Sequence, residues 1–427
     1  MKKKSNNKLT RRDFIKTTAG AIGGATITLG FPNIILAKKR PIRIGALQDL
    51  TGPLYSFGRW GKRSVAGAVK RINEMGGIAG RPVELKVEDS ATNVQKGVMK
   101  LRKLILKDKC DFIIGPCNSG ITIASAPIAK ETNTIFFAYG TALSITAHKG
   151  NRYIFRGINN VRHIFKALAM TVLKEMGKRY YCMGADYEWG HSVVDEAKRV
   201  FDKEGGKLIG EEYSPIGTED FIPYLNKINP DEVDVIIAGY FTKDILKLAT
   251  QAYELGLTKK VQIIGGAMPT GLTVKDLGPA GDKIWFSGYG IRRIANMPEE
   301  LKKYNLEFRK RIGMDEEGRD IKTKEMGAAS YTWAPWEHVY WVKKGIEKSG
   351  WNSKKDNLKF MMALEGMHVK ASYEFPQGDK TMRAEDHQVF ASQTVSKIEN
   401  GKFVVKAIIP GEKLYYPPLV DYRKEKV

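Results

Sequence analysis

Short apolar runs alternate with amphipathic helical stripes along this chain, and this alternation restricts the folds that it can adopt. In the first part of the chain, apolar runs predict buried strands, and apolar residues spaced three and four apart predict helices. These elements are the strands 42–47, 83–88, 112–115 and 135–138 and the helices 65–72, 94–105 and 121–131. Repeated strand–helix–strand units are typical of a parallel sheet that helices cover on both faces.

The same rhythm begins again after residue 160. The further elements are the helices 161–172, 193–201 and 245–252 and the strands 179–184, 233–238 and 261–264. A chain of 427 residues is also longer than one hydrophobic core usually covers. We therefore predict an α/β protein with two Rossmann-like lobes built on parallel sheets. Such sheets bind ligands beyond the carboxyl ends of their strands, so two facing lobes predict a cleft that closes by hinge motion.

The N-terminal segment has the pattern of an export signal. Residues 10–16 read TRRDFIK and precede an apolar stretch that ends near Ala37. This pattern indicates a twin-arginine signal peptide over residues 1–37, which sends a folded protein to the periplasm. An uncleaved membrane anchor is the alternative, but the stretch is rich in glycine and interrupted by Pro32, which favours cleavage after Ala37.

The composition and the motifs argue against several classes of function. The net charge of +23 permits binding to nucleic acid, but Lys and Arg are spread along the whole chain, and no nucleic-acid-binding pattern is present, so we expect a basic solvated surface. No Walker, GxGxxG or GxSxG pattern stands at a suitable strand end. The acid–His segment 383–388 tempts a catalytic interpretation, but we expect a structural role in the second lobe. We predict no enzyme, no cofactor and no metal site.

Small polar residues follow two strands of the first predicted sheet. The loop after 112–114 places Ser119 at the predicted N-cap of the next helix, where free backbone N–H groups suit a carboxylate. Simple helix capping without a ligand explains Ser119 equally well. The loop after 135–138 brings Gly140 and Thr141 to the same edge of the sheet.

Aromatic residues gather at other strand ends. Tyr187 and Trp189 stand at a strand-to-helix turn, Tyr240 follows the strand 233–238, and the loop 51–60 carries Phe57 and Trp60. They could stack on a ligand, or they could pack across the hinge, and the spacing does not separate these interpretations.

An ordered set of short strings resembles the leucine/isoleucine/valine-binding protein family, the type I periplasmic solute-binding proteins of transporters powered by ATP. These strings are 49–53 with 57–58, 76–85, 113–116, 186–190, 238–240 and 254–257. The resemblance covers about residues 41–400. It implies two lobes joined by three crossovers, namely 41–157 with 287–360 and 158–286 with 361–410, followed by a tail at 411–427.

The resemblance also implies roles for individual residues. The Ser and Thr that hold a ligand carboxylate in the family match Ser119 and Thr141, and the backbone of Gly140 lies beside them. The aromatic residues that enclose the ligand match Phe57, with Trp60 one helical turn further, then Trp189 or Tyr187, and Tyr240 or else Phe241.

One departure from the family concerns the ligand. Amino-acid binders of the family place an acidic residue after the strand that matches 261–264, where it pairs with the ligand ammonium, but residues 265–270 here read GGAMPT. A buried ammonium without an anionic partner costs on the order of several kcal/mol. This departure argues against a plain α-amino acid and favours an organic acid, for example an aromatic one, or an amide, with an amino-acid-like solute as the remaining alternative. The expected partners are this small molecule and an ABC transporter permease, with the protein acting as a monomer; a sensor that reports to a receptor kinase is the alternative.

Overall fold

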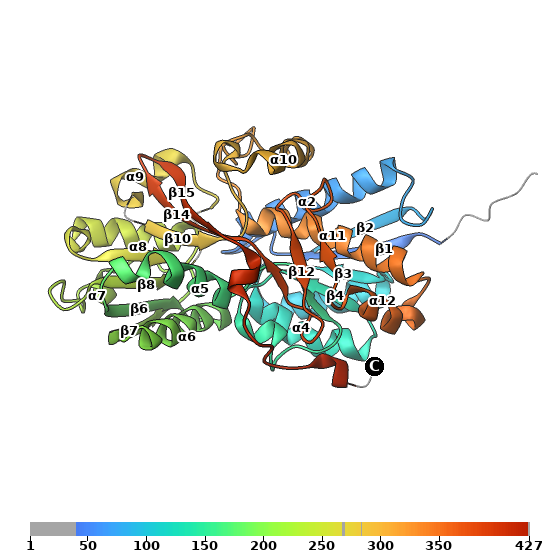
Figure 1. Ribbon diagram of the computed structural model, residues 1–427, viewed down its shortest axis with the longest axis horizontal. Helices are drawn as coiled ribbons and strands as arrows, with labels where there is room; N and C mark the ends of the chain where they lie inside the picture. The colour runs from blue at the N-terminus through green and yellow to red at the C-terminus, as the bar shows by residue number, and fades with distance from the viewer. Residues whose placement is uncertain (1–39, 267–269, 283, 426–427) are drawn as a thin grey trace, which may run out of the picture. The chain divides into compact units, whose positions relative to one another are not determined.

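Two β-sheets, each covered by helices, organise the chain after residue 39 (Figure 1). This computed structural model describes residues 40–266, 270–282 and 284–425. The predicted export signal and its cleavage site at Ala37 lie outside these ranges. Within the ranges, no helix is both long and apolar enough to cross a membrane.

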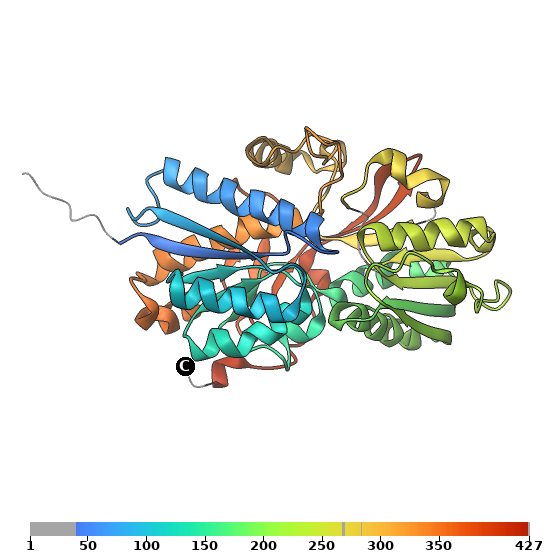
Figure 2. The same cartoon turned by 180° about the vertical axis from the view of Figure 1, so that it is seen from behind.

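The first sheet has five parallel strands in the order β2-β1-β3-β4-β5. These strands are β1 (Ile42–Gln48), β2 (Val83–Asp89), β3 (Phe112–Ile114), β4 (Ile135–Ala138) and β5 (Ile154–Arg156). Helices α3 and α4 lie side by side on one face, which Figure 2 shows, and α11 contacts both α2 and α12. This group, here called the first lobe, comprises α2 (Tyr55–Glu74), α3 (Val94–Arg102), α4 (Ser119–Glu131), α11 (Ser330–Ser349) and α12 (Asn357–Leu364), with α10 (Glu299–Ile312) against α2.

The second sheet has seven strands in the order β15-β14-β10-β9-β8-β6-β7. Five of them are parallel, namely β6 (Arg179–Ala185), β7 (Lys207–Ser214), β8 (Val235–Gly239), β9 (Gln262–Gly265) and β10 (Ile284–Gly288). The antiparallel hairpin β14 (Gln393–Glu399) and β15 (Lys402–Ile409) extends the sheet beyond β10. The second lobe is this sheet with α5 (Val161–Thr171), α6 (Glu188–Lys203), α7 (Ile222–Leu225), α8 (Thr242–Glu254) and α9 (Val274–Gly281).

The chain passes between the two lobes three times: after β5, after β10 and between β13 and β14. The predicted fold class, two α/β lobes joined by three crossovers, is confirmed. A small antiparallel sheet was not predicted; it consists of β11 (His368–Val369), β12 (Lys380–Met382) and β13 (Val389–Ala391). The lobe boundaries expected at 286/287 and 360/361 fall inside β10 and α12, and the apolar stretch 389–395 is divided at Ser392 between two sheets.

The predicted loop 51–60 is shorter than expected, because α2 begins at Tyr55. Gly58, in the first turn of α2, makes this early start possible. A Cβ atom at Gly58 would lie 2.1 Å from the carbonyl oxygen of Asp49, so any other residue would push the helix off the end of β1. Phe57 and Trp60 are therefore helical residues with fixed directions.

Candidate functional site

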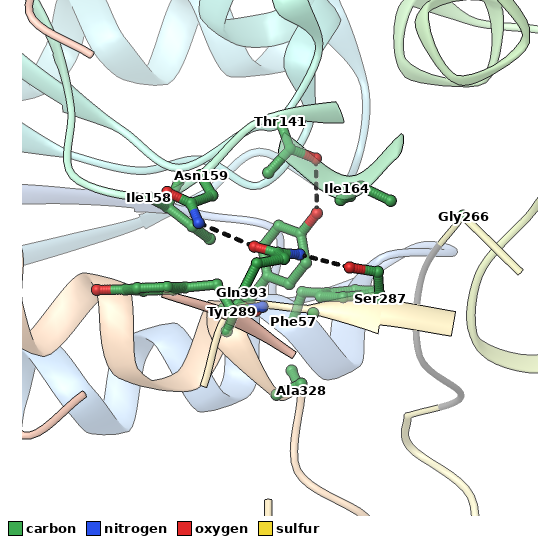
Figure 3. A pocket seen from close by; sticks show the side chains of 14 residues that line it. Phe57, Thr141, Ile158, Asn159, Ile164, Gly266, Ser287, Tyr289, Ala328 and Gln393 are labelled. Carbon is green, nitrogen blue, oxygen red and sulfur yellow. Dashed lines mark hydrogen bonds between the residues drawn. The ribbon is translucent and has the colours of Figure 1, made fainter. Parts of the chain in front are cut away.

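Thr141 connects the two lobes at the carboxyl ends of their sheets. Its hydroxyl oxygen accepts a hydrogen bond from the indole Nε1 of Trp189, in the first turn of α6, at 2.8 Å. The same oxygen lies 2.8 Å from the phenol oxygen of Tyr331, at the start of α11 (Figure 3). Thr141 thus contacts one side chain of each lobe, and its own side chain is buried.

An aromatic cluster surrounds this contact. Phe57 of the first lobe meets Tyr331 edge-on at 4.9 Å between ring centroids and Phe241 of the second lobe at 6.0 Å. Phe241 in turn lies 5.9 Å from Tyr187 and 5.8 Å from Trp189. Edge-to-face packing of this kind favours one relative position of the two lobes.

A cavity of about 30 Å³ adjoins Phe57 and Tyr331 of this cluster. Figure 3 shows side chains of its wall. Three buried polar side chains that lie close to the crossovers form a chain of hydrogen bonds on its wall. Asn159 donates from Nδ2 to Gln393 Oε1 at 2.9 Å, and Gln393 donates from Nε2 to the hydroxyl of Ser287 at 3.0 Å. The full wall consists of Phe57, Thr141, Ile158, Asn159, Ile164, Gly266, Ser287, Gly288, Tyr289, Ala328, Ala329, Ser330, Tyr331 and Gln393.

Ser119 and Gly140 lie behind Thr141 and do not line this cavity. The N-cap of α4 is Asn118, whose Oδ1 accepts from the N–H of Ile121, so the prediction of Ser119 as N-cap is wrong. Asn118 has the extended backbone that a cap needs, and Ser119 already belongs to the helix. Its hydroxyl accepts from the N–H of Ala142 at 3.3 Å, and a Cβ atom at Gly140 would lie 2.9 Å from this hydroxyl.

A buried carboxylate supports the loop before α4. Asp49 accepts from the N–H groups of Cys117 and Asn118, at 2.9 and 3.1 Å, and from the hydroxyl of Ser90. Burial raises the pKa of Asp49 to about 6, although these three donors oppose the rise. Asp49 thus holds the end of β3 against the end of β1, and the sequence did not single it out.

Two of the expected site residues point into the lobe cores. Tyr240 is fully buried in the second lobe, where its hydroxyl lies 2.9 Å from that of Ser214 and its ring packs on Phe221. Its neighbour Phe241, and not Tyr240, belongs to the aromatic cluster. Trp60 is buried in the first lobe beneath the guanidinium of Arg63. Among the expected residues, the structure brings together Phe57, Thr141, Tyr187 and Trp189.

The described surroundings of the cavity include a buried positive charge but no acidic side chain on the wall. No Asp or Glu belongs to its wall among the described residues. Residues 267–269, within the stretch where the family acid was expected, lie outside the described ranges, and their sequence is Ala-Met-Pro. Behind Thr141 lies the guanidinium of Arg156, which is fully buried. Burial lowers the pKa of Arg156 to about 10, so it stays charged at neutral pH.

A second set of contacts joins the lobes away from the cavity. Glu188, in the first turn of α6, accepts from the hydroxyl of Ser144 at 2.5 Å and from the ammonium of Lys149 at 2.7 Å. The hydroxyl of Ser192, one turn further along α6, accepts from the N–H of Leu143 at 2.9 Å. Burial opposes ionisation of Glu188, but the bonds from Lys149 and Ser144 outweigh it and lower its pKa.

The acid–His segment 383–388 packs on the first lobe. Arg383 pairs with Asp386, and the ring of His387 stacks on Phe155 of β5 at 3.9 Å. The expected location in the second lobe is therefore wrong, since β13 ends before the third crossover. In the described part of the chain, no group of three His, Cys, Asp or Glu residues is arranged to hold a metal ion.

The sequence interpretation missed Tyr331, Asn159, Ser287 and Gln393. Asn159 follows β5, Ser287 lies near the end of β10, and Gln393 begins β14. Tyr331 lies in the first turn of α11, and no local motif marks any of these four positions as a ligand contact. Asn159, Ser287 and Gln393 share a positional signal: they stand close to the points where the chain changes lobe, and a three-crossover fold brings those points together.

Comparisons with known proteins agree with this architecture. The family model described as periplasmic binding protein matches residues 41–402. The Leu/Ile/Val-binding protein homolog 3 of Brucella melitensis biotype 1 is 24% identical over 325 residues, which is 76% of this chain and 82% of that protein.

Two solved structures share the fold. The solute-binding protein of an ABC transporter from Rhodopseudomonas palustris BisB5, in complex with 3,4-dihydroxybenzoic acid, has a TM-score of 0.73 and 18% identity and covers 87% of this chain and 98% of its own. A solute-binding protein from R. palustris in complex with benzoate has a TM-score of 0.73 and 19% identity, with 87% and 97% covered.

Proposed function

This chain belongs to the periplasmic binding protein family, and we propose that it captures a small organic carboxylate between its two lobes and delivers it to the permease of an ABC transporter. The family implies a periplasmic location and a role in binding rather than catalysis. We propose three further points: that the ligand is a carboxylate, that the protein delivers it to a permease, and that residues of the cavity wall bind it.

The hydrogen-bonding capacity of the cavity wall carries the choice of a carboxylate. Only one O–H can donate within the contact between Thr141 and Tyr331, so the second keeps its proton for another acceptor. Ser287 accepts from Gln393 and likewise keeps its own proton to donate. A carboxylate is an acceptor only, whereas an ammonium needs an anionic partner, and no described Asp or Glu lines the wall.

The aromatic cluster supports a planar ligand. The rings of Phe57 and Tyr331 belong to the cavity wall, and Phe241 packs against Phe57 behind it. Two proteins of the same fold were solved with benzoate and with 3,4-dihydroxybenzoic acid, which have this shape. We therefore place aromatic carboxylates first among the candidates.

The cavity requires the lobes to move. A volume of about 30 Å³ has room for about one water molecule, so a ligand of the size of benzoate enters only when the lobes separate. When they close again, Thr141 and Trp189 re-form their contact beside the ligand. The ligand then stabilises the closed form, because only this form contacts it from both lobes.

A binding screen tests the proposed ligand class. The purified protein is heated with benzoate, 4-hydroxybenzoate, an aliphatic carboxylate, benzamide, leucine or valine. A ligand at 100 times its dissociation constant adds about 2.7 kcal/mol to the free energy of unfolding, so a true ligand raises the melting temperature by several degrees. We expect shifts with aromatic carboxylates. Shifts with leucine or valine, together with no shift for benzoate, 4-hydroxybenzoate or the aliphatic carboxylate, would contradict the proposal.

Delivery to a permease needs a test in cells. Deletion of the protein should abolish uptake of the radiolabelled ligand at low external concentration, if the protein delivers its ligand as a monomer to a transporter. Unchanged uptake together with a lost transcriptional response would instead identify a sensor. We further propose export through the twin-arginine pathway, on the basis of residues 10–16.

A further inference from the structure

The guanidinium of Arg156 lies beneath the loop that carries Thr141, and neutral groups satisfy all of its hydrogen bonds. Nε donates to Gln388 Oε1 at 2.6 Å. Nη1 donates to the carbonyl oxygens of Gly140 and Ala142, and Nη2 to the carbonyl of Leu143 and the hydroxyl of Thr146. Five acceptors thus match the five N–H groups of the side chain.

This buried charge has no ion-pair partner among the described residues. Asp386, whose charge acts on Arg156 from a distance, forms its ion pair with Arg383. A buried cation normally pairs with an anion, because desolvation of a single charge is costly. Arg156 therefore leaves a net positive charge next to a cavity whose described wall has no carboxylate.

The carbonyl bonds of Arg156 also fix the direction of a backbone donor. The peptide between Gly140 and Thr141 is planar, so its N–H points opposite to its C=O. Since the carbonyl of Gly140 faces the guanidinium, the N–H of Thr141 must point away from it. Within the described ranges this N–H meets no protein acceptor, and Thr141 itself lines the cavity. The peptide between Ala142 and Leu143 obeys the same rule, because the carbonyl of Ala142 faces Arg156 and the N–H of Leu143 reaches Ser192.

We propose that Arg156 is the positioning residue that makes the cavity select carboxylates over uncharged ligands of the same shape. It acts through the loop 140–143: it orients the N–H of Thr141 as a donor to the ligand carboxylate and supplies the positive potential behind it. It does not contact the ligand. This inference rests on the proposed function, since it concerns the same cavity.

The test compares benzoate with benzamide, which differ in charge and hardly in shape. Affinities are measured by calorimetry for the wild-type protein, Arg156→Gln and Arg156→Lys. We expect Arg156→Gln to lower the benzoate-to-benzamide affinity ratio by about tenfold or more. Arg156→Lys keeps the charge but cannot satisfy five acceptors, so both affinities should fall while the ratio changes less. A merely structural role would lower both affinities together and leave the ratio unchanged, which would overturn the inference.

Arg81→Gln is the matched control. Arg81 is also buried, and its guanidinium bonds the carbonyl oxygens of Arg40, Trp351 and Asn352, but it lies away from the cavity wall. We expect the benzoate-to-benzamide affinity ratio of Arg81→Gln to equal that of the wild-type protein within about twofold. If this control changes the ratio as strongly as Arg156→Gln does, the effect is not specific and the inference fails.

A measurement on the wild-type protein covers the case in which Arg156→Gln does not fold. The amide proton of Thr141 is followed by NMR during titration with each compound. We expect benzoate to shift it downfield and benzamide to shift it much less. An unperturbed Thr141 amide at saturating benzoate would overturn the inference, even though the proposed function would stand. If the wild-type protein binds no carboxylate, both the proposed function and this inference are wrong.

Discussion

The indole Nε1 of Trp189 and the hydroxyl oxygen of Thr141 lie 2.8 Å apart, and this hydrogen bond joins the two lobes at the edge of the cavity. The two residues belong to different sheets and stand 48 positions apart in the chain. In the function that we propose, this bond re-forms when the two lobes close on the ligand.

This bond predicts coupled effects on affinity. Thr141→Val and Trp189→Phe each remove one partner, and each should weaken binding of the carboxylate that the screen identifies by about tenfold, because a buried hydrogen bond contributes about 1 kcal/mol and its lost partner more. In the double variant the losses should not add, since the same bond cannot be lost twice. Calorimetry on the four proteins measures the coupling. Strictly additive losses would show that the two side chains act independently.

The contacts of Glu188 predict a weaker effect that depends on salt. Glu188→Gln removes the charge that Lys149 contacts across the lobes, and both side chains are partly exposed. An exposed ion pair contributes about 0.2–1 kcal/mol, so affinity should fall about two- to fivefold in dilute buffer and hardly at all at 1 M salt.

Glu211→Gln is the control for this prediction, because Glu211 pairs with Lys198 inside the second lobe. It should leave the affinity unchanged at both salt concentrations. An equal effect of the two variants would mean that Glu188 acts on the second lobe alone and not on closure.

The sequence was informative about the lobes because strands and helices have different periods, and because one local rule recurs. Gly58 and Gly190 both follow an aromatic residue in the first turn of a helix. A Cβ atom at either position would clash with a carbonyl oxygen at the end of the preceding strand, that of Asp49 or of Ala185. A Phe-Gly or Trp-Gly pair therefore fixes an aromatic side chain at a strand end in each lobe, which made Phe57 and Trp189 predictable.

The rest of the site depends on contacts that no local pattern encodes. In the pair Tyr240-Phe241, either ring could face the cleft, and the register of β8 turns Tyr240 towards Phe221 and into the core. Tyr331 reaches Thr141 only because α11 returns to the first lobe after the second crossover. Such positions follow from tertiary packing, which one sequence without its relatives does not show.

Two Tyr→Phe variants separate these roles. Tyr331→Phe removes the hydroxyl that contacts Thr141 and should weaken binding about tenfold, with little change in stability. Tyr240→Phe removes the hydroxyl bonded to Ser214 and should lower the free energy of unfolding by about 1 kcal/mol, with affinity unchanged. Calorimetry and urea unfolding measure both quantities. The reverse pattern would restore Tyr240 to the site and exclude Tyr331.

The export proposal predicts a cellular location. Replacement of Arg11 and Arg12 by lysine keeps the charge but removes the arginine pair, so we expect the protein to accumulate in the cytoplasm, with its first 37 residues attached. Fractionation and mass spectrometry show location and length. The control is Lys3→Arg with Lys4→Arg, which exchanges the same two residue types outside the arginine pair. We expect this variant to be exported normally. Normal export of the first variant would rule out the twin-arginine pathway.

Buried histidine predicts how stability depends on pH. Nε2 of His338 accepts from the N–H of Gly157 at 3.1 Å, so this nitrogen carries no proton. Burial, with a smaller contribution from Lys380, lowers the pKa of His338 to about 3. The unfolded chain binds this proton near pH 6.5, so the native state loses about 1.4 kcal/mol per pH unit as the pH falls below that value towards 3. Burial likewise lowers the pKa of His163, which adds a loss of the same sign.

His338→Gln isolates the contribution of one histidine, because a glutamine oxygen can accept from Gly157 but does not titrate in this range. Between pH 6.5 and 5, the wild-type protein should lose about 2 kcal/mol more of its free energy of unfolding than this variant does. Asp49 acts in the opposite direction, since its pKa is raised to about 6, but it does so in both proteins and cancels in the comparison. Parallel urea-unfolding curves for the wild type and His338→Gln at the two pH values would show that His338 takes up its proton without unfolding, against the burial that the structure gives it.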